Sequence, residues 1–95
     1  MIDGEIYELI SDPQCVFAYC ERGSCTTSFY IGVSCAGCIH VSSIGYIRGM
    51  CGNSESRIAS PEALLRFNTL LQNGGYKWNK ENKVVINNET GIIKI

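Results

Sequence analysis

The sequence predicts a small α+β domain: a curled antiparallel sheet or partly open barrel, with one helix and a C-terminal β-hairpin. Three observations lead to this fold class. The chain has 95 residues, enough for one domain with a single modest core. Apolar and polar residues alternate through residues 5–48, and helical spacing begins only after Ser60. We therefore expect a single domain over residues 1–95, with a β-meander at 5–48, a helix at 60–74 and a hairpin or meander at 75–95.

The first half of the chain reads as a series of short strands. Each is rich in β-branched or aromatic residues and ends at a turn cluster such as Ser11-Asp12-Pro13. A small sheet twisted by its own backbone curls and hides its edges, so we expect an arrangement that resembles an SH3-like barrel. The predicted strands are residues 5–10, 15–20, 27–35, 39–43 and 45–48.

A helix is predicted from Pro61 to Asn73. Ser60 is a favourable N-cap, and proline suits the first helical position because its missing N–H has no partner there anyway. Leu64, Phe67 and Leu71 follow at helical spacing, with Ala63 and Leu70 beside them, and glycines come next. A helix of this length is marginal alone, so its apolar stripe must pack on the sheet.

The C-terminal segment returns to strand-like patterns. Residues 76–78 and 83–86 flank the polar stretch Asn79–Asn82, which predicts a four-residue hairpin loop. A further strand is expected at residues 92–95. Gly49–Ser56 is expected to be a connector, because it lacks the Lys-Ser/Thr ending of a phosphate-binding loop.

Charge and composition exclude several classes of function. The chain is too short for a multidomain enzyme, and its formal net charge of -1 argues against a protein whose affinity depends on neutralising phosphates. Residues 1–5 include two acids where a secretory leader has lysines, so we expect a cytoplasmic protein. The stretch Gly23–Ile47 has no charged side chain, but it has no leucine and alternates with period two, so we predict strands there and no membrane span.

Six cysteines are the most unusual feature of the composition. In a reducing compartment they would stay free thiols, and most of them would act as small buried hydrophobic residues. The alternative is a zinc site, because Cys35 and Cys38 form a CxxC pair and His40 lies close by. A second CxxC is missing, so the remaining ligands would have to come from Cys15, Cys20 or Cys25.

Cys38 and His40 would share one face of a strand, which is the minimal pair for a cysteine nucleophile. No Asp or Asn nearby orients the histidine, and no sharp turn exposes the thiol. We therefore predict no catalytic residues and no enzymatic activity.

Aromatic residues are the candidates for an interaction surface: Tyr30, Tyr46, Tyr76 and Trp78. Either they face a partner, or they fill a core that covers both sheet faces. Tyr76 and Trp78 beside the hairpin lysines would also suit stacking on single-stranded nucleic acid. For Trp78 we favour packing in the core, and for the lysines a solvated turn.

The segment from Ala59-Ser60-Pro61-Glu62 through Gly75-Tyr76-Lys77-Trp78-Asn79 to Lys83 resembles a module in small uncharacterised proteins of gut bacteria and their phages. Those proteins look like a short β-barrel, then a helix opening with Ser/Thr-Pro-Glu, then a Gly-Tyr-x-Trp-Asn hairpin. The resemblance implies an accessory protein of a mobile element and transfers no catalytic residue.

These observations predict a small intracellular binding module that acts through contact with an unidentified protein or through self-association. The first alternative is a zinc-stabilised module with Cys35, Cys38 and His40 as ligands. The second is a nucleic-acid accessory protein that uses the hairpin. No cofactor other than zinc is expected.

Overall fold

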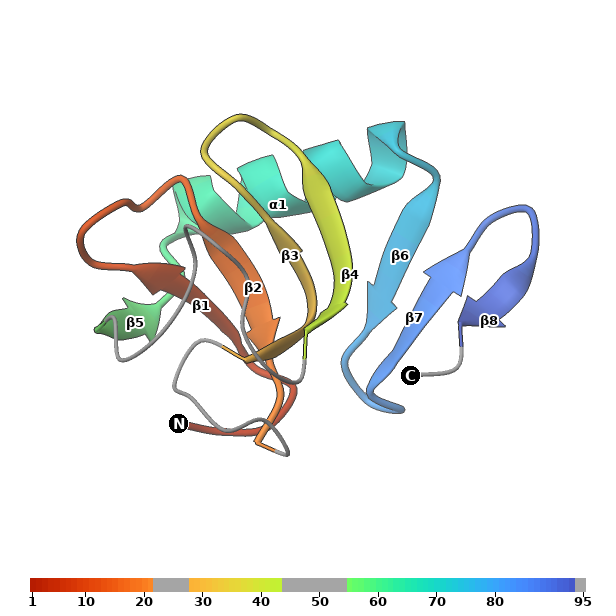
Figure 1. Cartoon of the computed structure of the whole chain (residues 1–95), viewed down its shortest axis with the longest axis horizontal. Helices are drawn as coiled ribbons and strands as arrows, with labels where there is room; N and C mark the ends of the chain where they lie inside the picture. Colours follow the sequence, from red (N-terminus) through yellow and green to blue (C-terminus); the bar gives the residue numbers. More distant parts are fainter. Residues whose placement is uncertain (22–27, 44–54, 94–95) are drawn as a thin grey trace.

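The computed structural model describes residues 1–21, 28–43 and 55–93 (Figure 1). It contains two antiparallel sheets and one helix, which confirms the α+β prediction; the sheets are not closed into a barrel. The elements in chain order are β1 (Ile6–Leu9), β2 (Val16–Tyr19), β3 (Phe29–Val33), β4 (Ile39–Ser43), β5 (Ser56–Ile58), α1 (Pro61–Asn73), β6 (Tyr76–Asn79), β7 (Val84–Asn87) and β8 (Gly91–Ile93).

The larger sheet has the strand order β4-β3-β2-β1-β5. Strands β1 to β4 form the predicted meander, because each pairs antiparallel with the next. Strand β5 is not among the predicted strands. It begins at Ser56, the last residue of the expected connector, and pairs with β1, with Tyr7 opposite Ile58. The predicted strand at 45–48 lies outside the described residues.

Both faces of this sheet are buried at its central strands, so β1 and β3 contain buried residues at every position. One face packs Tyr7, Leu9, Cys15, Phe17 and Phe29 into an aromatic cluster. The other face contributes Val16, Ala18, Ile31 and their neighbours to the main core. Covering both faces accounts for the continuous apolar character of the strands.

Helix α1 covers the main-core face and begins and ends as predicted. Ser60 Oγ accepts the Ala63 amide at 3.1 Å, and Pro61 occupies the first turn. Ala63, Phe67 and Leu71 are its buried residues, and they pack in the main core. After the helix, Gly75 has a φ of +83°, a conformation that side chains disfavour.

The second sheet, β6-β7-β8, stands beside the first (Figure 1). Val85 of β7 is fully buried in the main core, so both sheets share one interior. The hairpin connection is residues 80–83, one residue later than predicted. It is fixed to the N-terminal segment by ion pairs of Lys80 with Glu5 (2.7 Å) and Lys83 with Asp3 (3.0 Å).

Candidate metal centre

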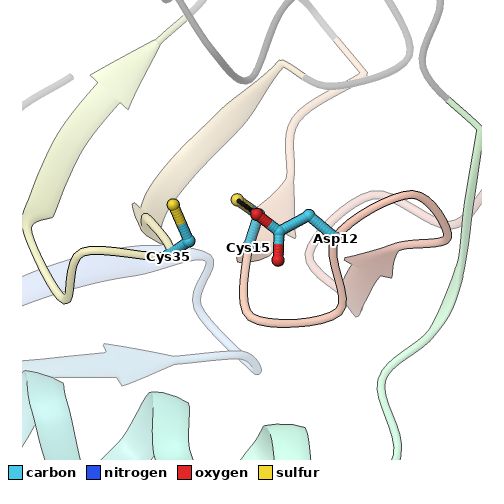
Figure 2. A group of neighbouring side chains, drawn as sticks. All are labelled: Asp12, Cys15 and Cys35. Carbon is cyan, nitrogen blue, oxygen red and sulfur yellow. Dashed lines mark hydrogen bonds between the residues drawn. The ribbon is translucent and has the colours of Figure 1, made fainter.

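Two turns at the same end of the larger sheet bring together three side chains with metal-ligating atoms: Asp12, Cys15 and Cys35. Their ligand atoms all lie within 4.8 Å of one another. Asp12 and Cys15 come from the turn between β1 and β2, and Cys35 comes from the turn between β3 and β4 (Figure 2). In an antiparallel meander these two turns lie at one end because the strands between them alternate in direction.

The first turn is built around Asp12. Its backbone carbonyl accepts the Cys15 amide at 2.9 Å, and its Oδ1 accepts the Gln14 amide at 3.2 Å. This is the local bonding that favours Asp at the start of a turn. The second carboxylate oxygen, Oδ2, accepts the Cys15 thiol at 3.6 Å. The turn thereby places a carboxylate directly beside a sulfur atom.

The second turn presents Cys35 to solvent. The Gly37 amide donates to the Ser34 carbonyl at 2.9 Å, and the Cys38 amide donates to Ser34 Oγ at 3.2 Å. Gly37 has a φ of +85°, which glycine adopts without strain. Cys35 is exposed, whereas Cys15 is 3% exposed, so the cluster is open on the Cys35 side.

Arg66 of α1 holds the two turns together. Its guanidinium donates to the Gln14 carbonyl of the first turn. It also donates to two carbonyls of the second turn, Ser34 at 3.1 Å and Cys35 at 3.4 Å. The rigid, multi-donor geometry of guanidinium suits such a bridge. The helix therefore fixes the spacing of the turns that present the three ligand atoms.

The electrostatics of the cluster keep Cys15 protonated when no ion is present. Burial raises the pKa of the Cys15 thiol to about 11, and the neighbouring Asp12 carboxylate contributes to the rise. A metal cation reverses this preference, because it binds the thiolate and releases the proton. Zinc takes both thiolate sulfur and carboxylate oxygen as ligands, so it is a metal that this donor set suits.

The cluster shares one residue with the ligand set predicted from sequence. Cys35 belongs to the cluster, but Cys38 and His40 do not, and over the described ranges no other group of three such residues converges. Cys38 is exposed and His40 is half-buried at the start of the edge strand β4. Spacing alone favoured the CxxC pair, whereas the fold turns Cys35 toward the neighbouring hairpin. The signal that sequence reasoning passed over is Asp12-Pro13-Gln14-Cys15, a turn with two ligand residues.

Two residues predicted for the interaction surface have other roles. Tyr30 is only 5% exposed, which corrects its assignment to a surface: its ring stacks on Trp78 with centroids 5.0 Å apart, and its hydroxyl donates to Asp3 at 3.0 Å. Trp78 donates from Nε1 to the Gly4 carbonyl at 3.2 Å and packs against the main core. Its ring therefore joins the second sheet to the first.

Tyr76 and Trp78 also line a groove of about 360 Å³ next to Leu71 of the helix. Tyr46 lies outside the described residues. We expected the hairpin lysines to be solvated; Lys80 and Lys83 are 57% and 47% exposed, and each also forms one of the ion pairs described above.

None of the helices in the described ranges has the length and apolar character needed to cross a bilayer. No family model, curated protein or solved structure matches the chain. The arguments about function therefore rest on the geometry of the molecule.

Proposed function

We propose that this protein is a small metal-binding domain in which Asp12, Cys15 and Cys35 hold a zinc-type cation between two turns. This is the zinc-stabilised alternative from the sequence, with a revised set of ligands. The observation that supports it is the convergence of two sulfur atoms and a carboxylate within 4.8 Å. Such an ion would tie the β1–β2 turn to the β3–β4 turn.

The distances favour zinc with little rearrangement. With Zn–S near 2.3 Å and Zn–O near 2.1 Å, ligand atoms around one tetrahedral ion lie about 3.5–3.8 Å apart. The turns would need to close by about 1 Å at most, a movement that side-chain rotation of the exposed Cys35 can supply. The Arg66 bridge already holds the backbones of the two turns next to each other.

The described residues would supply three ligands, and the exposure of Cys35 leaves a fourth position on the solvent side. Closed structural zinc sites have four protein ligands, whereas a water molecule or an outside donor completes a three-ligand site. We propose that water fills this position in the isolated domain. A donor from a bound protein could take its place.

The test is metal binding by the reduced chain and by single-residue variants. Cobalt or cadmium titration reports thiolate ligation through charge-transfer absorption, and zinc affinity follows by competition. We expect one equivalent to bind. Cys15→Ser, Cys35→Ser and Asp12→Ala should each weaken binding by at least about tenfold, because each removes one of three ligands.

Cys38→Ser is the matched control, since Cys38 is an exposed thiol in the same turn as Cys35. It should bind metal like the parent chain. Binding that is lost in Cys38→Ser or His40→Ala and retained in Cys15→Ser would support the ligand set predicted from spacing. Less than about a tenth of an equivalent bound under reducing conditions would reject a metal centre altogether.

A second candidate function, contact with another protein, is favoured by a specific surface at the β5 edge. Three large apolar side chains are exposed there: Met1 (52%), Ile2 (66%) and Ile58 (58%). They are neighbours, because Ser56 Oγ lies 3.7 Å from Met1 sulfur, the Ile2 amide donates to the Tyr7 hydroxyl, and Tyr7 pairs with Ile58. Exposed apolar patches of this kind often mark interaction sites.

In the described part of the sheet, β5 pairs only with β1, so its outer edge offers backbone groups to an added strand. Such contact agrees with the accessory role that the resemblance over residues 59–83 implies. Ile58→Lys should abolish retention of a partner from host extract, while Leu65→Lys, on the exposed face of α1, should not. Equal retention by both variants and the parent would reject this surface.

A further inference from the structure

We propose that Cys15 and Cys35 form a reversible disulfide, so that this protein has thiol–disulfide activity at the junction of its two turns. The inference uses the same pair of sulfur atoms as the proposed metal centre but does not require a metal. It goes beyond that function because it assigns covalent chemistry to two cysteines that are far apart in sequence and free in this structure.

The geometry brings the sulfurs close without bonding them. Their Sγ atoms lie within 4.8 Å, and a disulfide requires about 2.05 Å. Cys15 is held in the Asp12 turn by its amide and thiol hydrogen bonds. Cys35 is exposed, so rotation of its side chain can close the remaining distance.

Arg66 restricts the backbone on both sides of this pair. It donates to the Gln14 carbonyl, one residue before Cys15, and to the Cys35 carbonyl itself. The two turns therefore stay adjacent in the reduced protein. Oxidation meets a preformed pair and does not need a chance encounter of distant segments.

The difference in exposure assigns the two cysteines different parts in the reaction. An oxidant such as glutathione disulfide, a low-molecular-weight disulfide, reaches the exposed Cys35 first. The Cys35 thiol releases its proton to solvent, and the thiolate attacks one sulfur of glutathione disulfide. A mixed disulfide forms on Cys35, and one glutathione thiolate leaves.

Cys15 then resolves the mixed disulfide. Its sulfur attacks Cys35 Sγ, the Cys35–glutathione bond breaks, and the Cys15 proton ends on the departing glutathione thiolate, which leaves as glutathione. In total, two cysteine thiols are oxidised by two electrons and one glutathione disulfide is reduced to two glutathione molecules. A thiol reductant reverses both steps.

The competing product is a disulfide between Cys35 and Cys38, which the CxxC spacing favours. In the structure, however, Cys38 is held by two bonds with Ser34: its amide donates to Ser34 Oγ, and its carbonyl accepts the Ser34 amide at 3.0 Å. The two possible products can be separated by peptide mapping, because the chain has an arginine between Cys15 and Cys35.

The experiment treats the reduced full chain with glutathione disulfide in the presence of a chelator, blocks the remaining thiols, and digests with trypsin. Cleavage after Arg22 and Arg48 places Cys15 on peptide 1–22, and it places Cys25, Cys35 and Cys38 on peptide 23–48. A Cys20→Ser background leaves Cys15 as the only cysteine of the first peptide. We expect the two peptides to be linked, with fragment ions assigning the second sulfur to Cys35, and dithiothreitol to release them.

Cys35→Ser should abolish the link, and Cys38→Ser should leave its yield unchanged. A disulfide confined to peptide 23–48, or a chain that stops at glutathione bound to Cys35, would overturn the proposal. Because the mapping is done without metal, the disulfide can be found even if the metal titration shows no binding. Equally, metal can bind to a chain that forms no Cys15–Cys35 disulfide. If both proposals are right, saturating zinc should suppress the linked peptide, since both use the same sulfurs.

Discussion

Glu8 is a buried acid in the first strand, with 2% of its side chain exposed. Its Oε1 accepts the Ser60 amide at 2.7 Å, and its Oε2 accepts two Arg57 donors at 3.0 and 3.1 Å. The Ser60 backbone bond, followed by the Arg57 guanidinium, lowers the pKa of Glu8 despite its burial. The carboxylate joins β1, β5 and the start of α1, a role that alternation in the sequence did not predict.

Replacing this carboxylate should lower the free energy of unfolding and should also make that free energy less dependent on acidic pH. Because the pKa of Glu8 is lower in the folded state than its ordinary value of 4.5, the stabilisation from this carboxylate is complete above that value and is lost as the pH falls through the folded pKa. Glu8→Gln should therefore reduce the free energy of unfolding by about 2 kcal/mol at pH 7. The difference from the parent should shrink below pH 4.5. Urea denaturation of both proteins at neutral and acidic pH measures this.

Arg57→Ala provides the comparison, because the Arg57 side chain is 57% exposed and solvent weakens its contribution. Its loss should cost only about 1 kcal/mol or less. A larger cost for Arg57→Ala than for Glu8→Gln would contradict the view that the Ser60 amide is the main partner of the carboxylate.

At the scale of elements, α1 is the part of the fold whose sequence signals are most local. Its cap, its first-turn proline and its buried stripe are all confirmed, since each depends on residues within one or two turns of the chain. Strand β5 shows the opposite case. Ser56–Ile58 has little apolar character of its own, and it becomes a strand because β1 offers an edge for pairing.

The Ser60 cap should contribute measurably to stability. Ser60→Ala removes the acceptor for the Ala63 amide and should lower the free energy of unfolding by about 1 kcal/mol. Thr69→Ala on the exposed part of the same helix should be neutral or slightly stabilising, because alanine has the higher helix propensity. Thermal denaturation followed by far-UV circular dichroism compares the two. Equal melting temperatures for Ser60→Ala and the parent would argue against the cap.

The buried face of α1 should have a much larger effect than its exposed face. Phe67 is fully buried and Leu65 is 70% exposed. Phe67→Ala should cost about 3–5 kcal/mol because it leaves a cavity in the main core, whereas Leu65→Ala should change stability by less than about 0.5 kcal/mol. Denaturant titration of the two variants tests the direction in which the helix packs. Similar losses for both would show that α1 is not docked as described.

For the whole molecule, the decisive feature is that two sheets and a helix share one interior. Val85 from the second sheet and Phe67 from the helix lie in the same cluster as Val16 and Ile31 of the first sheet. The stacking of Trp78 on Tyr30 joins the two sheets, and the ion pairs of Lys80 and Lys83 join the hairpin to the N-terminal segment. Val85 joins the second sheet to this shared cluster, so we expect the second sheet to depend on the first for its stability.

The chain should therefore unfold in one cooperative step. Trp78 is the only tryptophan, so its fluorescence reports separation of the second sheet from Tyr30, while far-UV circular dichroism reports the helix. The two signals should give the same midpoint in urea. A fluorescence transition at clearly lower urea concentration would show that the C-terminal sheet undocks first and that the shared core is weaker than its burial indicates.

The sequence by itself determined those features that depend on neighbours along the chain. The limits of α1, the meander from β1 to β4 and the C-terminal hairpin follow from caps, periodicity and turn residues, whose interactions span only a few positions. Tertiary structure alone decided that β5 pairs with β1, that Tyr30 is buried under Trp78, and that Cys35 meets Cys15 and Asp12 but not Cys38 and His40. The reason is physical: these contacts join segments separated by long stretches of chain. Their formation depends on which strands are adjacent and which turns share an end of the sheet, and no local pattern encodes either.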